Sequence, residues 1–345
     1  MSLFLKNYFS TISYIIILYF FYSQIWYYQD FLITNFQFKF IDLNINSLYI
    51  FQSIILLYMI LLVPFYFKNN NKSKALTIID SLFKKNKNNK EKENLKTSFL
   101  ALLVKWFFAP LMIIWLTWHI ITTLNNIYLS YNDISFLTKE FYLYFNKHFF
   151  WLFLSIILFF DVLFFTLWYL LESDKLNNKI KSVDSSFIWW FVVLLCYPPF
   201  NIYTTNIIWW YSSEFPNFTN EYIHITLNIF ILILMWIYSW SSISLWLKAS
   251  NLTNRWIVVK WPYKYIRHPA YITKNLAWWI WWLPLLIWNF YIWDYKNFFI
   301  VLFSLIAWTF IYYLRAITEE KHLSNDSDYL KYKEKVKFKF IPKIY

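Results

Sequence analysis

Residues 149–171 read FFWLFLSIILFFDVLFFTLWYLL, and this stretch decides the class of the fold. Asp161 is the only acidic or basic side chain in the run, and nearly all the others are apolar. A helix of roughly 17–25 such residues crosses a hydrocarbon core about 30 Å thick. Because backbone polar groups in lipid must be hydrogen-bonded within their own segment, the run predicts a transmembrane helix.

Similar apolar runs recur along the whole chain. Its 345 residues are 59% hydrophobic and 15% charged, with a mean hydropathy of +0.38, which is typical of an integral membrane protein. Besides 149–171, the runs lie near 12–29, 48–67, 98–124, 187–208, 224–247, 277–293 and 298–314. The last two are short and closely spaced, as in a hairpin that dips into the membrane or tilts. We expect an all-α polytopic protein with about eight transmembrane helices, because the alternation typical of a barrel is absent.

Basic residues are concentrated in alternate loops. The segment 68–97 carries nine lysines, whereas 30–47 and 209–223 carry almost no basic charge. The positive-inside rule then places 68–97 in the cytoplasm. With eight crossings, both termini, the basic segment 248–276 and the tail from Arg315 lie on that same side. We expect a site that faces the cytoplasm, in the plasma (inner) membrane if the protein is prokaryotic.

The net charge of +13 is explained by this bias in the loops. A nucleic-acid-binding protein would instead carry a basic face on a soluble domain, so we expect no nucleic-acid partner. The segment 68–97 is predicted to be a solvated, disordered linker. Binding of anionic lipid headgroups is the alternative.

Cysteine and histidine give no sign of a metal site or of an internal disulfide. Cys196 is the single cysteine and lies in an apolar run, where it is predicted to be a small core residue. The five histidines show no ligand spacing, so no metal is expected. The first apolar run lacks a small-residue cleavage site and is expected to remain as a helix. The sequence does not indicate an oligomeric state.

The chain contains no glycine and 22 tryptophans. Average usage of roughly 7% would give about 24 glycines. Tryptophan stands at positions such as Trp256 and Trp261, where its bulk has no evident use. Our hypothesis is that many tryptophans are glycines in the native protein, from a codon that the source organism reads as glycine. An aromatic belt at the membrane interface is the alternative, but it does not explain the absence of glycine.

Two regions differ in polar content. Residues 1–186 hold four apolar runs with featureless loops and no assigned role. Asp161 lies in the fourth run, where an ionisable group is either functional or bonded to a neighbouring helix. Residues 187–345 hold the polar motifs. In 187–208, Pro198 and Pro199 lack backbone donors and bias Tyr197 away from helical geometry, which predicts a break or kink that is compatible with a pocket wall.

The stretch VKWPYKYIRHPAY at 259–271 is a basic, tyrosine-rich island between apolar runs. Its distinctive residues are Pro262-Tyr263, Arg267-His268-Pro269 and Tyr271, followed after a helical hairpin by Glu319-Glu320 and then Tyr329 and Tyr332. This order resembles the isoprenylcysteine carboxyl methyltransferase and phospholipid methyltransferase superfamily. The family pattern reads Gly-Pro-Tyr-x-x-x-Arg-His-Pro-x-Tyr-x-Gly, then a hairpin and Glu-Glu. Trp261 and Thr273 stand where that pattern has glycine.

The resemblance covers roughly 224–345, with its motifs at 254–275 and 315–332. It implies a methyltransferase-like bundle over 187–345, whose cytoplasmic end closes over S-adenosylmethionine and whose side admits a lipid-like acceptor. Carried over residue by residue, it implies a cofactor pocket lined by Arg267, His268, Pro269, Tyr271, Glu319, Glu320 and Tyr329. Arg267, His268 and Glu320 are the expected catalytic residues.

Recognition of the methyl donor, S-adenosylmethionine, requires the same residue types. S-adenosylmethionine carries an amino group, a carboxylate, an adenine and a sulfonium, which are recognised by carboxylates, cations and aromatic rings. Arg267, the pair Glu319-Glu320, Tyr265 and Tyr271 supply them. Methyl transfer is an in-line displacement, and catalysis consists mainly of holding the methyl donor and the acceptor at reacting distance. A carboxylate acceptor needs no base, whereas for an amine acceptor a carboxylate or His268 could take the proton.

Three functions compete at this stage. The first is a methyltransferase acting on an isoprenoid-like carboxylate, a phospholipid amine or another membrane amphiphile. The second is an NADPH-dependent enzyme like the sterol reductases, which also end in a basic aromatic tail such as 340–345. The third is a transporter or scaffold, favoured if Asp161 and the break at 197–199 line a path, although inverted repeats are absent. Taken alone, Arg315 with Glu319 would be a solvated helix face.

Overall fold

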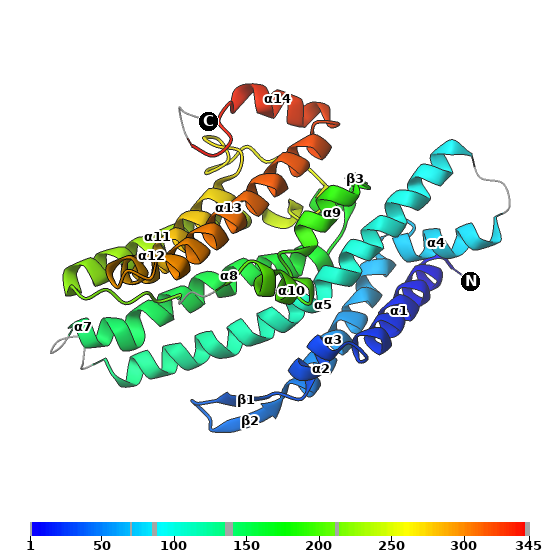
Figure 1. Ribbon diagram of the computed structural model, residues 1–345. Helices are drawn as coiled ribbons and strands as arrows, with labels where there is room; N and C mark the ends of the chain where they lie inside the picture. The colour runs from blue at the N-terminus through cyan, green and yellow to red at the C-terminus, as the bar shows by residue number, and fades with distance from the viewer. Residues whose placement is uncertain (1, 70, 85–87, 135–140, 211–213, 342–345) are drawn as a thin grey trace.

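The computed structural model describes residues 2–69, 71–84, 88–134, 141–210 and 214–341, and most of them lie in long helices (Figure 1). Six helices among them are long and apolar enough to span a membrane. They are α1 (Leu3–Tyr22), α3 (Ser47–Phe67), α5 (Asn89–Asn132), the run from α7 (Phe141–Tyr144) through a π-helical turn (Phe145–Phe149) into α8 (Phe150–Leu170), α11 (Glu221–Ser244) and α13 (Tyr295–Leu323). The chain is an all-α integral membrane protein.

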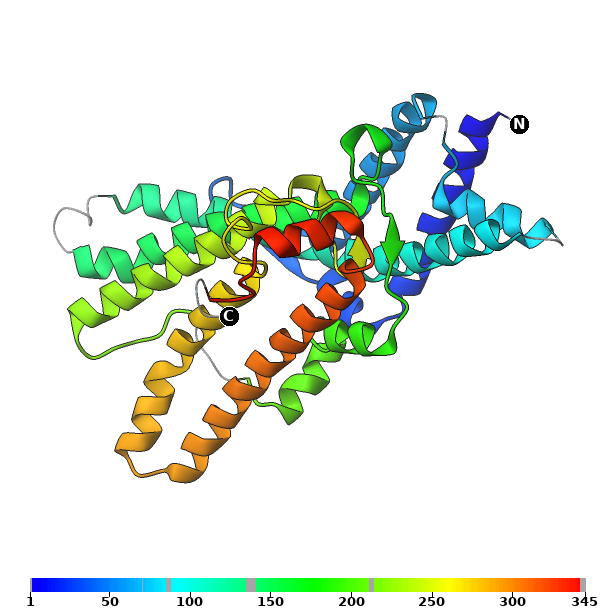
Figure 2. The ribbon, with the colours of Figure 1, turned by 90° about the horizontal axis from the view of Figure 1, so that it is seen from above.

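The two remaining apolar runs form different structures. The run 187–208 is divided into α9 (Phe187–Leu194) and α10 (Phe200–Ile207), and the break falls at the paired prolines, as their missing donors predict. The run 277–293 belongs to α12 (Pro269–Tyr291), which is long but contains several polar side chains and is not among the six. Figure 2 shows α12 and α13 as an antiparallel hairpin.

Several predicted boundaries are wrong. The first helix begins at Leu3 rather than near residue 12, because the Ser2 side chain accepts the Leu5 N–H and caps it. The predicted run 98–124 extends to both sides in α5, which starts with a capping box between Asn88 and Glu91. Hydropathy marks only the part of a helix that faces lipid, so polar turns at helix ends are missed.

The segment 68–97 is not a disordered linker. It contains α4 (Lys74–Phe83), capped by Ser73 and anchored by buried Ala75 and Leu76, and the first turns of α5. The helix packs on α5 and α1, while Leu82 and Phe83 at its end are exposed. Lys85 and Lys87, which contribute to the basic charge of this segment, lie outside the described residues, as do the last four residues of the tail, 342–345.

The remaining elements are short and lie in the loops. They are α2 (Trp26–Leu32), the hairpin β1 (Asn35–Phe38) with β2 (Leu43–Asn46), two one-turn 3₁₀ helices (Asp174–Leu176 and Trp246–Lys248), β3 (Ser182–Val183), β4 (Thr253–Asn254) and α14 (Ser327–Lys335). The antiparallel pair β3–β4 aligns Ser182 with Asn254. This pairing ties the loop after α8 to the loop before α12.

The largest apolar core lies between α8, α11, α12 and α13. Phe150, Ile231, Trp282 and Leu305 in it are completely buried. A second core joins α5 and the end of α8 to α9, and includes Leu252 from the loop before α12. Residues on both sides of position 186 therefore share one packed interior.

Polar contacts gather the loops at two ends of the bundle. At one end, Lys74 pairs with Glu172, and Lys181 pairs with Asp326 and donates its backbone N–H to Asn254. At the other end, Asn125 donates to the carbonyl of Gln37, His148 contacts Asp133, and His224 contacts Asn146. The basic segments 68–97 and 248–276 and the C-terminal tail therefore lie at the same end of the molecule.

Two helices end on a tryptophan in left-handed backbone geometry. Trp246 follows the last residues of α11 with φ 52°, and Trp293 follows those of α12 with φ 61°. After α12 the Asp294 N–H donates to the Asn289 carbonyl at 2.9 Å and the Trp293 N–H to the Phe290 carbonyl at 3.2 Å. This is the Schellman pattern, whose left-handed residue is usually glycine. For a bulky side chain such geometry is a true outlier.

Candidate functional site

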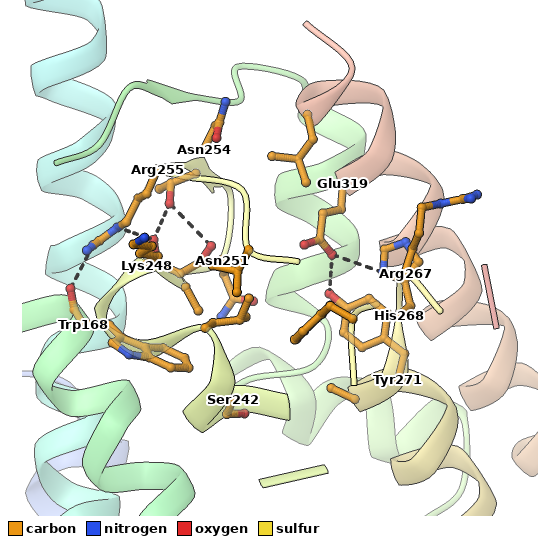
Figure 3. Close-up of a pocket in the computed structure, with 18 of the residues that line it drawn as sticks. Trp168, Ser242, Lys248, Asn251, Asn254, Arg255, Arg267, His268, Tyr271 and Glu319 are labelled. Carbon is orange, nitrogen blue, oxygen red and sulfur yellow. Dashed lines mark hydrogen bonds and ion pairs between the residues drawn. The ribbon is translucent and has the colours of Figure 1, made fainter. Parts of the chain in front are cut away.

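A cavity of about 170 Å³ opens at the end of the bundle where the basic segments meet. Its wall is formed by the loop after α11, the first turns of α12, the last turns of α13, and α14 (Figure 3). The polar and aromatic lining includes Tyr197, Tyr238, Ser242, Lys248, Asn251, Arg255, Trp256, Tyr263, Arg267, His268, Tyr271, Lys274, Tyr312, Arg315, Glu319, Tyr329 and Tyr332.

Local sequence explains how Arg267 and His268 are held. Pro269 is the first residue of α12, where its missing N–H costs nothing, and His268 caps the helix with φ −125° and ψ 58°. The backbone N–H groups of Arg267 and His268 donate to the carbonyls of Phe338 and Lys339, each at 3.0 Å. The C-terminal segment thus lies along the start of α12.

Arg267 and Glu320 form a buried ion pair. Arg267 Nε donates to Glu320 Oε1 at 2.7 Å, and one terminal nitrogen of the guanidinium donates to the carbonyls of Val336 and Lys337, both at 2.7 Å. His268 Nε2 lies 3.1 Å from the same Glu320 oxygen. Three of the five guanidinium N–H groups of Arg267 are thus given to protein acceptors, and these contacts fasten the C-terminal segment over the site.

Glu319 is the carboxylate that faces the cavity. Its Oε2 accepts from the Tyr271 hydroxyl at 2.8 Å and lies 3.9 Å from His268 Nδ1. The rings of His268 and Tyr271 stack, with centroids 5.3 Å apart and an interplanar angle of 4°. Figure 3 shows this group on one wall of the cavity and Arg255, Asn251 and Trp168 on the facing side.

The structure separates the predicted site residues into two groups. Arg267, His268, Tyr271, Glu319 and Tyr329 line the cavity, as listed above with the rest of its wall. Glu320 is buried behind them, and Pro269 contributes the backbone turn. Tyr265 points away: it is 54% exposed, and the Lys264 ammonium lies 4.8 Å from its ring centre. The aromatic role expected of Tyr265 falls instead to cavity tyrosines.

Two cations of the cavity wall, the partly buried Lys274 and the buried Arg315, were missed by sequence reasoning. Lys274 Nζ lies 5.1–5.7 Å from the ring centres of three aromatic residues, Tyr238, Trp278 and Tyr312. Arg315 is 4% exposed, lies over the rings of Tyr197, Tyr271 and Tyr312, and donates to Asn251 Oδ1 at 2.9 Å. This burial excludes the alternative in which Arg315 belongs to a solvated helix face.

Helical spacing could have found both cations. Lys274 follows Tyr271 by three residues, and Arg315 precedes Glu319 by four, so each shares a helix face with a motif residue. The buried Nε atom of Arg315 has no hydrogen-bond partner among the described residues. A buried donor of this kind is suited to an anionic group of a ligand.

Arg255 fixes the loop that closes the cavity. It is 2% exposed and donates to the carbonyls of Trp168 at 2.8 Å, Asn178 at 3.1 Å and Leu247 at 3.3 Å. Burial lowers the pKa of Arg255, and nearby Glu172 opposes that shift. Asn251 in the same loop donates to the hydroxyls of Tyr169 and Tyr197, so this wall is held from both sides.

We expect Arg255→Met to destabilise the protein by roughly 2–3 kcal/mol, because buried carbonyls lose a charged donor. The measurement is thermal unfolding in detergent micelles. Lys260→Met, on the exposed part of the next segment, is the matched control and should leave the melting temperature unchanged. Equal melting temperatures for the two variants would contradict this role of Arg255.

No protein-family model, curated protein or solved structure matches this chain. Any functional conclusion therefore rests on the site itself and on its short motifs. Across the described ranges, no group of three His, Cys, Asp or Glu side chains is placed to hold a metal ion.

Proposed function

We propose that this protein is an integral membrane methyltransferase that uses S-adenosylmethionine and acts on a lipid-like or isoprenoid-like amphiphile. The observation that carries the proposal is the convergence of two distant motifs. Arg267-His268 and Glu319-Glu320 are separated by a helical hairpin in the sequence, yet they meet within hydrogen-bond distance beside one cavity. That order and that meeting are what the motif resemblance implies.

The polar and aromatic side chains of the cavity suit S-adenosylmethionine, which has a zwitterionic amino-acid end and a positively charged sulfonium. Glu319 offers a carboxylate for an amino group, and Arg315 and Lys274 offer cations for a carboxylate. The stacked pair His268 and Tyr271 offers aromatic faces for adenine or for positive sulfur. These assignments move the cation role from Arg267, whose charge is balanced by Glu320, to Arg315 and Lys274.

The size of the cavity bears on this assignment. Its volume of about 170 Å³ is below the roughly 300–1,000 Å³ typical of small-molecule sites. The indoles of Trp168 and Trp256 form part of its wall. Glycine at these two positions would widen the cavity, so the proposed reading of tryptophan as glycine favours a donor-sized site.

The mechanism relies on positioning. When bound, S-adenosylmethionine supplies an electrophilic methyl group on a sulfonium. The chain fixes the reacting groups in place: the Arg267–Glu320 pair holds the C-terminal segment over the cavity, and Arg255 holds the opposite loop. A carboxylate acceptor needs no proton transfer. For an amine acceptor, the base is Glu319, a partly exposed carboxylate in the cavity wall.

The membrane topology belongs to the same proposal. Eight crossings, counting α12 and the interrupted pair α9–α10, place both termini and the cavity at the end that carries the basic segments. The positive-inside rule then puts this end in the cytoplasm. The acceptor reaches the site from the bilayer, and S-adenosylmethionine reaches it from the cytoplasm.

The test is transfer of a labelled methyl group from S-adenosylmethionine in native membranes, compared with membranes that lack this protein. Native membranes are used because they contain whichever residue the source organism places at the tryptophan positions. We expect label in the lipid extract, or base-labile label released as a volatile product from protein if the acceptor is a carboxyl group. No difference between the two membranes would contradict the proposal, and binding of reduced nicotinamide would then test the reductase alternative.

A further inference from the structure

A second cavity lies in the N-terminal half and is lined by α1, α3 and α5. Figure 1 shows where these three helices lie. Its volume is about 420 Å³, within the roughly 300–1,000 Å³ range of small-molecule sites. Among the described residues, it shares none of its lining with the cavity at the motifs. It also contains no tryptophan in that described lining, so it does not depend on how tryptophan codons are read.

The cavity is polar at one end and apolar along its length. Leu18, Phe51, Ile55 and Ile113 form part of the apolar wall at the level of the membrane-spanning helices. The polar end lies where α3 ends and α8 ends, at Tyr66 and beyond Leu170. This division matches an amphiphile whose headgroup lies at the membrane surface and whose chain lies in the bilayer.

The polar end carries an excess of positive charge. Four lysines (Lys72, Lys74, Lys105 and Lys179) line it, with two carboxylates, Glu172 and Asp174. Lys74 Nζ lies 2.5 Å from Glu172 Oε1, and Lys105 Nζ lies 2.7 Å from Glu172 Oε2. One carboxylate therefore neutralises two ammonium groups, whose side chains are only 15% and 18% exposed. A partly buried positive charge of this kind favours an anionic partner.

Two of the three helices around the cavity, α1 and α3, are poorly packed by protein alone. Only 11% of the most apolar window of α1, and 11% of that of α3, is buried within the chain. Membrane helices associate through close packing rather than through a hydrophobic effect, so a filled space between them would add contacts. A lipid chain between α1, α3 and α5 supplies those contacts.

We infer that this cavity binds an anionic membrane phospholipid, with its phosphate at Lys74 and Lys105 and one acyl chain between α1, α3 and α5. The site is separate from the proposed methyltransferase site. If one of the two proposals fails its experiment, the other is still tested by its own.

The test uses the full-length protein in detergent micelles, titrated with phosphatidylglycerol or phosphatidylcholine of the same chains and followed by native mass spectrometry. We expect phosphatidylglycerol to bind more tightly. Lys74→Met should weaken its binding about fivefold, since each lysine near an anionic surface contributes roughly 1 kcal/mol. Lys105 still neutralises Glu172 in that variant, and Lys84→Met, outside the cavity, is the matched control.

Glu172→Gln separates binding from misfolding. It leaves two ammonium groups without their carboxylate, so phosphatidylglycerol should bind more tightly, whereas a merely damaged fold would bind less. Ala109→Phe fills the apolar part and should weaken phosphatidylglycerol binding. Equal affinity for the two lipids, or no effect of Lys74→Met and Glu172→Gln, overturns the inference. Binding of oleate with exclusion of phosphatidylglycerol overturns the choice of a phospholipid.

Discussion

Replacing Glu319 by glutamine is expected to lower the affinity for S-adenosylmethionine about 10- to 100-fold, because a charge-assisted hydrogen bond contributes roughly 1.5–3 kcal/mol. Glu319 faces the cavity, and its side chain is 31% exposed. Its closest contact is the Tyr271 hydroxyl at 2.8 Å, and the buried His268 Nδ1 lies farther away at 3.9 Å. The melting temperature of the variant should therefore stay close to that of the parent protein.

Glu320→Gln should behave differently although the two residues are adjacent. Glu320 is buried and balances Arg267, with His268 and Lys339 nearby. Breaking a buried ion pair costs roughly 3–5 kcal/mol, so this variant should lose both stability and donor binding. His268→Ala should abolish donor binding, because it removes the ring that stacks on Tyr271, while the protein still folds in membranes.

Isothermal titration in detergent micelles, paired with thermal unfolding, distinguishes these variants. Glu334→Gln, on the exposed face of α14, is the isosteric control and should change neither quantity. Unchanged donor affinity in Glu319→Gln and Glu320→Gln would show that the motifs do not form a donor site. A parallel loss of stability in both would instead assign Glu319 a structural role.

The second large effect concerns the tryptophans that occupy glycine-like positions. Peptides of the native protein that cover positions 246, 256 and 293 are expected to carry the mass of glycine. Trp246 and Trp293 have left-handed backbone geometry at helix ends, where glycine is the usual residue. Five other tryptophans bury an indole N–H that has no hydrogen-bond partner among the described residues, namely Trp106, Trp168, Trp281, Trp282 and Trp308. Buried tryptophan normally pairs that group.

A pair of variants tests the same point by stability. Trp293→Gly should stabilise the protein by about 1–2 kcal/mol, the cost that left-handed geometry imposes on an ordinary residue. Trp288→Gly is the matched control: it is also exposed and lies nearby, but inside α12, where glycine costs roughly 1 kcal/mol. We expect the free energy of unfolding to rise in Trp293→Gly and to fall in Trp288→Gly. Tryptophan masses at 246 and 293 in native material would exclude the codon hypothesis.

Some features could be predicted because they depend on local chemistry. Apolar runs such as 149–171 predict helices in a membrane whatever their neighbours, and Pro198-Pro199 predicts a break because proline has no backbone donor. Helix ends such as the Ser2 and Asn88 caps were missed, because hydropathy is insensitive to them. The linker prediction for 68–97 failed since α4 becomes stable only by packing on α5 and α1.

By itself, the sequence determined the membrane class, the helical architecture, and the motifs Arg267-His268 and Glu319-Glu320, because each follows from residue type and spacing along one segment. Tertiary structure alone decided which of these residues face the cavity. Arg267 lines the cavity but is paired with Glu320 and donates to carbonyls of the C-terminal segment, whereas Tyr265 points to solvent. Helical spacing places Lys274 and Arg315, the cations of the proposed site, beside motif residues, but their contacts depend on elements far apart in the chain, which no local pattern records.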